Sequence, residues 1–330
     1  MGSQVSLIRR PAGTYSFGHS GCGVLLAPNL PLPATAMKKI HHLCRNFLWN
    51  SRRAPVAWEE VCHRTEERGL GIRHIQSWNM ALLARVLWNI HRKADTLWVQ
   101  WVNNVYLRGG SIWEWQPKKG DSPLLRRLAD IRDRLITAFG TTGAAVESMV
   151  AWSNLKGLET SKAYEYFRPK HTRQPWKAAI WRAFIPPKYS FILWLGLRGR
   201  LATRDRLAFL QEDPTCSLCI NTNETTKHLF FECPFSASVW SDIRQWLGIN
   251  RRMSTILSAI KWLKKEKTGS SVQNKARLLA LACTVYSLWR HRNEVIFEGK
   301  APYPKGLVIS IRITVYRLLL TLFPHRMFAF

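Results

Sequence analysis

Three cysteines and one histidine lie within 18 residues of this chain, with the spacing C-x2-C-x8-H-x4-C. They are Cys216, Cys219, His228 and Cys233. A C-x2-C turn presents two thiolates at once, and zinc prefers four sulfur or nitrogen ligands in a tetrahedron. The spacing therefore predicts one zinc ion bound by these four side chains. Because protein would fill all four positions, we expect the metal to be structural rather than catalytic.

The residues around the motif favour an ordered loop. Thr225 is expected to cap the turn that carries His228, and Pro234 is expected to end that turn. Leu229 and Phe230 are expected to pack against flanking helices. The chain has seven cysteines, an odd number, and in a reducing compartment clustered cysteines indicate metal more often than disulfides. The alternative is that the three cysteines are simply buried as small apolar side chains.

The charge of the chain indicates its partners. The 330 residues include 49 Lys and Arg against 21 Asp and Glu, a formal charge of +28. Such an excess favours contact with a polyanion, and phosphate backbones are the commonest ones; the alternative is a basic surface without a ligand. No secretory signal is found in residues 1–31, and the longest apolar run, residues 278–289, is too short to span a bilayer. We expect no membrane partner and an intracellular location, in the nucleus or cytoplasm.

Hydrophobic spacing predicts an all-α fold with two helical subdomains and a small CCHC zinc knuckle. No internal repeat and no strand-rich block is found. The predicted helices cover residues 33–48, 75–90, 96–106, 124–138, 176–184, 188–197, 204–210, 239–247, 273–294 and 304–322. The predicted segments are a loose leader (1–30), a helical segment (31–110), a loop-rich connector (111–163), a zinc-binding domain (164–250) and a basic helical tail (251–330).

Around the motif, the chain resembles the zinc-binding domain at the C-terminal end of plant non-LTR (LINE-type) reverse transcriptases. The resemblance is carried by WKAAIWRAFIPPKYSFILWLGLRGRLATRDRLAFLQ, then CSLC, NETTKHLFFEC and SASVW, within residues 164–247. The segment that follows the polymerase core in those proteins is similar to LPLPATAMKKIHHLCRNFLWN and WEEVCHRTEERGLGIRHIQSWNMALLARVLWNIH, and their usual end resembles WRHRNEVIFEG. Residues 1–28 match nothing in that pattern.

The resemblance implies a nucleic-acid-binding role without catalysis. The family carries its catalytic carboxylates in a Tyr-x-Asp-Asp turn, and this sequence contains no Asp-Asp pair. The acidic doublets Glu59-Glu60 and Glu66-Glu67 are expected to be solvated helix faces. The endonuclease of the family is missing too. We therefore expect no polymerase activity and no small-molecule substrate, in a catalytically empty C-terminal third of such an element.

Basic residues cluster just before the zinc motif. Residues 161–210 contain eleven Lys or Arg and two acids, with aromatic residues interleaved. Cations for phosphates and rings for bases are how single strands are bound with little sequence preference. Trp176 and Trp194, however, are expected to be core residues. The predicted contacts to RNA or DNA are Lys188, Arg198, Arg200, Arg204 and Arg206. The alternative function is an inert or protein-binding relic of a retroelement.

Overall fold

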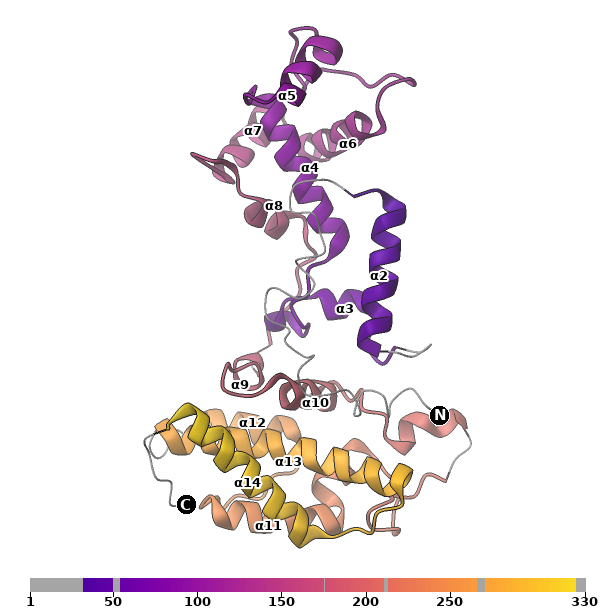
Figure 1. Cartoon of the computed structure of the whole chain (residues 1–330), viewed down its shortest axis with the longest axis vertical. Helices are drawn as coiled ribbons and strands as arrows, with labels where there is room; N and C mark the ends of the chain where they lie inside the picture. Colours follow the sequence, from indigo (N-terminus) through magenta and orange to yellow (C-terminus); the bar gives the residue numbers. More distant parts are fainter. Residues whose placement is uncertain (1–31, 50–53, 175, 211–212, 266–270, 325–330) are drawn as a thin grey trace. The chain divides into compact units, whose positions relative to one another are not determined.

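A computed structural model describes residues 32–49, 54–174, 176–210, 213–265 and 271–324. These residues are mainly helical, and the two strands among them have two residues each (Figure 1). The predicted all-α class is therefore confirmed. The predicted leader, residues 1–30, lies outside the described residues. The described part divides into two compact units, and each is considered by itself.

The first unit contains residues 32–45 and Leu70–Thr172. It includes the start of α2 (Ala34–Trp49), α4 (Ile75–His91), α5 (Leu97–Val102) with the π-helical turn η2 (Asn103–Leu107), α6 (Pro123–Phe139), α7 (Thr142–Ala151), the antiparallel strands β1 (Ser153–Asn154) and β2 (Gly157–Leu158), and α8 (Thr160–Phe167). The helices predicted at 33–48, 75–90 and 124–138 are confirmed, with ends that differ by one residue.

The segment 111–163, predicted to be rich in loops, holds more helix than its sequence indicates. Besides α6 it contains α7 and the start of α8. The glycines and threonines before α7 look like a loop, but Thr141 is its N-cap and accepts a hydrogen bond from the amide of Ala144 at 3.1 Å. The cap and tertiary packing therefore outweigh the weak helix propensity of TTGA.

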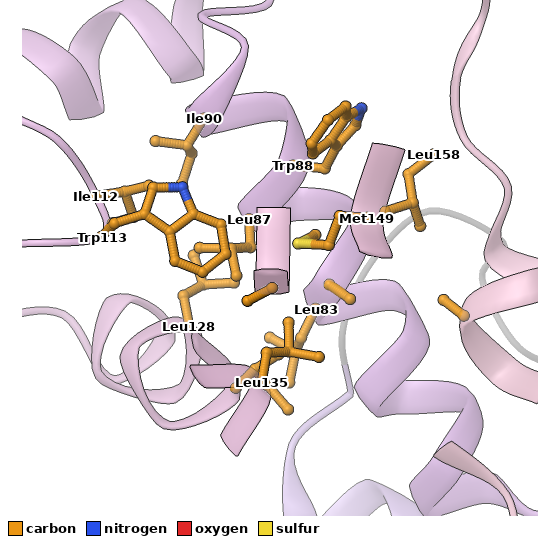
Figure 2. Packing of buried hydrophobic residues seen from close by; sticks show 14 of the residues in the cluster. Leu83, Leu87, Trp88, Ile90, Ile112, Trp113, Leu128, Leu135, Met149 and Leu158 are labelled. Carbon is orange, nitrogen blue, oxygen red and sulfur yellow. The ribbon is translucent and has the colours of Figure 1, made fainter. Parts of the chain in front are cut away.

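Helix α4 lies at the centre of the first unit because it is apolar on most of its circumference. It packs against α6 and α8. Figure 2 shows Leu83, Leu87 and Trp88 of α4 meeting Leu128 of α6 and Met149 of α7. Each of these five side chains is buried. This cluster is the core of the unit.

A buried arginine fastens the loop before α6 to that core. Arg132 is 1% exposed. Its guanidinium donates to the backbone carbonyl of Ile112 at 2.9 Å and to that of Trp115, and it pairs with Asp133 at 2.7 Å. Arg132 therefore satisfies carbonyls that the loop cannot bond internally.

We predict that Arg132→Met destabilises the protein by about 2–4 kcal/mol, because it leaves two carbonyls without a donor. Urea unfolding monitored by circular dichroism measures the change. The matched control is Arg126→Met, since Arg126 lies on the same helix and is exposed; its effect should stay within about 0.5 kcal/mol. Equal effects of the two variants would contradict this account of Arg132.

The second unit contains Asn46–Gly69 and Arg173–Phe330, as far as they are described. Its elements are α3 (Trp58–Cys62), η1 (Thr65–Glu67), α9 (Lys177–Ile180), α10 (Pro187–Leu197), η3 (Arg204–Leu210), η4 (His228–Glu232), α11 (Pro234–Trp246), α12 (Ile256–Lys265), α13 (Ser271–Glu298) and α14 (Pro304–Leu322). Helix α13 packs against α10, α11, α12 and α14. It is therefore the central helix of this unit (Figure 1).

Several local predictions for the second unit are confirmed. Pro187 opens α10 and Gly248 follows the end of α11, at a φ of 61° that favours glycine. Trp176 and Trp194 are buried. Residues 204–210 form a 3-10 helix rather than an α-helix, α9 is shorter than predicted, and α12 was not predicted.

The sequence predicts that the acidic doublets Glu59-Glu60 and Glu66-Glu67 are solvated, and the structure agrees for only some of these residues. Glu59 is exposed, whereas Glu67 is 5% exposed and Glu60 pairs with Arg198. The prediction is therefore wrong for Glu67. Among the described residues, no helix is both long enough and apolar enough to cross a bilayer.

Candidate metal centre

The first two sulfur atoms are positioned by a tight turn. The amide of Ile220 donates to the carbonyl of Cys216 at 2.9 Å, and the amide of Cys216 donates to the carbonyl of Thr222 at 2.8 Å. Ile220 has a φ of 57°, which is an outlier for a β-branched residue. Such strain persists only where the surroundings impose it. A metal bound by Cys216 and Cys219 would impose this turn.

The other two side chains are positioned by η4 and the start of α11. Thr225 accepts a hydrogen bond from the amide of His228 at 3.0 Å, as its predicted capping role requires. The carbonyl of Leu229 accepts from the Ser236 hydroxyl at 2.6 Å, and Leu229 itself is buried. Cys233 is the N-cap of α11, and Pro234 is its first residue rather than only the end of the preceding turn.

The structure brings all four predicted ligands together. Their ligand atoms lie within 4.8 Å of one another, and they are the only such group of three or more His, Cys, Asp or Glu in the described part of the chain. The Sγ atoms of Cys216 and Cys233 are 4.0 Å apart, and Cys219 Sγ is 3.4 Å from His228 Nε2. Ligand atoms around a tetrahedral zinc are about 3.5–3.8 Å apart, given bonds of about 2.0–2.3 Å. The group fits one zinc ion.

The electrostatics of the group favour thiolate. The pKa of Cys216 is lowered to about 5, chiefly because the Cys233 thiol donates a hydrogen bond to it, and further because of the amides of Leu218 and Cys219. Burial acts in the opposite direction. The pKa of Cys233 is raised, since Cys233 is the partner that keeps the shared proton. A zinc ion would take the place of that proton and stabilise both thiolates.

A hydroxyl group lies beside the histidine ring. Thr222 Oγ1 is 3.2 Å from His228 Nδ1 and 3.3 Å from Nε2, and Nε2 is 3.4 Å from Cys219 Sγ. With Nε2 on a metal, Nδ1–H can donate to the Thr222 hydroxyl and so fix the ring orientation. The donor set therefore includes an outer partner as well as four candidate ligands.

A buried ion pair attaches the cysteine loop to α13. Glu224, which lies between Cys219 and His228, is fully buried. Its Oε1 and Oε2 accept from Nη2 and Nε of Arg292 at 2.6 and 3.0 Å. Oε1 also accepts from the backbone amide of Arg204 at 2.9 Å. Sequence reasoning missed this pair, because 68 residues separate its members.

The five predicted cations have different surroundings. Arg198 is 10% exposed in its side chain, pairs with Glu60, and donates to the carbonyl of Arg68 at 2.8 Å. Burial, followed by the charge of Arg200, lowers its pKa. Arg198 is thus bonded within the fold.

Of the other four predicted cations, two also interact with groups within the fold and two do not. Arg204 pairs with Asp213 at 3.5 Å, and Lys188 lies over the rings of Tyr189 and Tyr286. Arg200 and Arg206 are exposed, and no carboxylate partner for either occurs within the described ranges. Two of the five predicted cations therefore remain available to a ligand.

Comparison with known proteins supports the metal centre. Residues 158–240 match the family described as zinc-binding in reverse transcriptase. A stretch of 72 residues is 35% identical to an Arabidopsis thaliana protein named "Putative ribonuclease H protein", and covers 20% of this chain and 12% of that relative. The chain thus spans a small part of the relative's length. No solved structure gives a significant match. Together, the matches support a relationship to retroelement proteins, and the family match and the Cys3His group confirm zinc as the predicted cofactor.

We predict about one zinc per chain, and its loss in Cys219→Ser, because a serine hydroxyl is a poor zinc ligand. Since binding energy at a structural site is folding energy, this variant should also melt earlier. Metal analysis and thermal unfolding measure the two effects. Ser217→Ala is the matched control, because no hydrogen-bond partner of the Ser217 hydroxyl occurs in the described part of the chain. Folded wild-type protein without zinc would contradict the prediction.

We also predict that Glu224→Gln lowers the free energy of unfolding by about 3–5 kcal/mol, because it leaves Arg292 buried without a counter-charge. Glu232→Gln in the same loop should cost about 1 kcal/mol or less, since Glu232 pairs with Lys227 at the surface. Urea unfolding compares the variants. If both lose the same stability, the buried pair does not hold the loop.

Proposed function

We propose that this chain binds RNA or DNA through phosphate contacts, and that zinc fixes the surface that makes them. The observation that carries the proposal is the pair of exposed arginines, Arg200 and Arg206, beside the metal centre. The match to a zinc-binding region of reverse transcriptase and the charge of +28 support it. Backbone contacts of this kind carry little sequence preference.

Arg200 lies in the turn after α10, and Arg206 lies in η3. Gly199 follows α10 with a φ of 59°, and a Cβ at this position would lie 3.2 Å from Arg206 Nη2. The guanidinium of Arg206 therefore lies across the backbone next to Arg200. The turn continues into η3, where the amides of Arg204 and Asp205 bond to Glu224. The cysteine loop thereby holds the start of η3, the element that carries Arg206.

In this proposal, zinc stabilises the shape of the cysteine loop and takes no part in a reaction. Bound zinc supplies a cross-link between the C-x2-C turn and η4, and with four protein ligands it has no open position. We propose that the chain has no polymerase activity, because the sequence lacks the Asp-Asp pair of that reaction. We further propose an origin in a LINE-type element of a plant and a location in the nucleus or cytoplasm. The motifs and the Arabidopsis relative support this origin.

The test is the double variant Arg200→Gln/Arg206→Gln. We expect weaker binding by the same factor for all sequences, and a plot of log affinity against log salt that is flatter by about two units. Fluorescence anisotropy with a labelled oligonucleotide measures both. Zinc content and unfolding midpoint should not change, since both side chains are exposed. Arg198 is left intact because its ion pair with Glu60 belongs to the fold.

Lys118→Gln/Lys119→Gln is the charge-matched control, because both lysines are exposed and lie in the other unit. This control should keep the wild-type slope. Equal slopes for wild type and the arginine variant would show that this turn is not the site. Wild-type protein with no salt-dependent affinity would favour the alternative, an inert or protein-binding relic.

A further inference from the structure

A small open cavity lies beside the metal centre, between the end of α10, η4 and the start of α12. Its volume is about 100 Å³. The apolar side of the lining is formed by Leu197, Phe231, Ile256 and Leu257. The rest of the lining consists of two hydroxyl residues, Thr226 and Thr255, together with Gly196 and Lys227. The cavity thus combines an aromatic ring with polar groups.

The size of the cavity limits its occupant. Binding sites for drug-sized ligands and cofactors have volumes of about 300–1,000 Å³, whereas a cavity of about 150 Å³ holds benzene. A volume near 100 Å³ is smaller than that, so the cavity encloses only part of one ring, and because it is open to solvent the rest of the ring remains outside. Anything attached to that ring must remain outside.

The aromatic wall is rigid. The ring of Phe231 stacks on Trp240, with 5.7 Å between centroids and 10° between planes. The indole N–H of Trp240 is fixed in turn by a bond to the carbonyl of Phe230 at 2.7 Å. A second flat ring entering the cavity would meet a pre-arranged apolar surface, which reduces the entropy that binding costs.

The polar groups suit a heterocycle with both donors and acceptors. No hydrogen bond of the Thr226 hydroxyl occurs among the described residues, and a hydroxyl can donate or accept. Thr255 Oγ1 accepts from the amide of Ser258 at 3.0 Å and keeps its proton for donation. These groups can bond to the carbonyl and N–H groups of a base edge.

The charges around the cavity favour an anionic chain outside it. Lys227 lies at its edge and is 58% exposed in an ion pair with Glu232. Exposed pairs of this kind are weak, so a phosphate can replace the carboxylate. Arg200, one of the two exposed arginines of the proposed phosphate site, lies three residues after Leu197 in the chain.

We infer that this cavity binds one base of a single-stranded nucleic acid. The inference rests on the proposed phosphate binding and adds base recognition to it. The base stacks against Phe231, the hydroxyls of Thr226 and Thr255 bond to its edge, and the sugar and phosphates lie outside. A duplex is excluded because its bases are paired.

The experiment compares three oligonucleotides of about 12 nucleotides over the same series of salt concentrations: deoxythymidylate, deoxyadenylate and an abasic backbone. We expect the full-length protein to bind deoxythymidylate and deoxyadenylate each about five- to hundred-fold tighter than the abasic chain. Phe231→Leu should bring deoxythymidylate to the abasic level and leave abasic affinity unchanged. The matched control Phe297→Leu, at a half-exposed phenylalanine of α13, should keep the preference.

The outcomes separate the two proposals. Abasic binding with the wild-type salt slope but no gain from the bases overturns the base pocket alone. Absence of salt-dependent binding to any probe overturns the proposed function. A Phe231→Leu protein with full zinc content and an unchanged midpoint that retains the preference also overturns the pocket.

Two further measurements apply if Phe231→Leu does not fold. Leu257→Trp, at an exposed position of the rim, should fill the cavity and abolish the preference. Photocrosslinking of wild-type protein to an oligonucleotide carrying 5-iodouracil should modify Phe231. Crosslinks that map only to residues away from the cavity lining would overturn the inference.

Discussion

The ion pair between Glu224 and Arg292 joins three segments that are far apart in the sequence. A buried carboxylate or guanidinium is costly unless it is paired and hydrogen-bonded, and this pair satisfies both conditions through two short bonds. The carboxylate comes from the cysteine loop and the guanidinium from the central helix α13. The same carboxylate accepts the amide of Arg204 at the start of η3. Removal of either charge would leave the other without compensation in the core.

Zinc and the Glu224–Arg292 ion pair constrain different features of the cysteine loop. The four candidate ligands close a loop of 18 residues on itself, which fixes its local shape but not its orientation on the helices. Glu224 supplies that orientation, and through the amides of Arg204 and Asp205 it also positions the start of η3, which carries Arg206 and follows the turn with Arg200. In the proposed function, the path from metal to phosphate contact would therefore run through the polypeptide backbone. A closed metal site would then act on binding without touching a ligand.

The sequence predicts those features that depend on local chemistry. Cys216, Cys219, His228 and Cys233 could be assigned because ligand spacing follows from the reach of a single turn, and α4 could be assigned because its apolar pattern is long. Helix α12 was missed because only ten residues form it, and its capping by Thr255 and Ser258 is visible only in space. The role of Arg292 could not be predicted, because its partner lies 68 residues away.

The cations show why a large net charge overstates the number of binding residues. Arg132, Arg198 and Arg292 bond to carbonyls or carboxylates within the fold, and local sequence does not distinguish them from Arg200. With 21 acids against 49 Lys and Arg, one-to-one pairing would still leave 28 cations without a carboxylate. The net charge sets the long-range field, which acts on the rate of encounter with a polyanion whichever residues carry it. Affinity at contact depends instead on exposed guanidinium groups that keep their donors. Arg200 in the turn after α10 and Arg206 in η3 are the two exposed guanidinium groups that the proposed function assigns to this role.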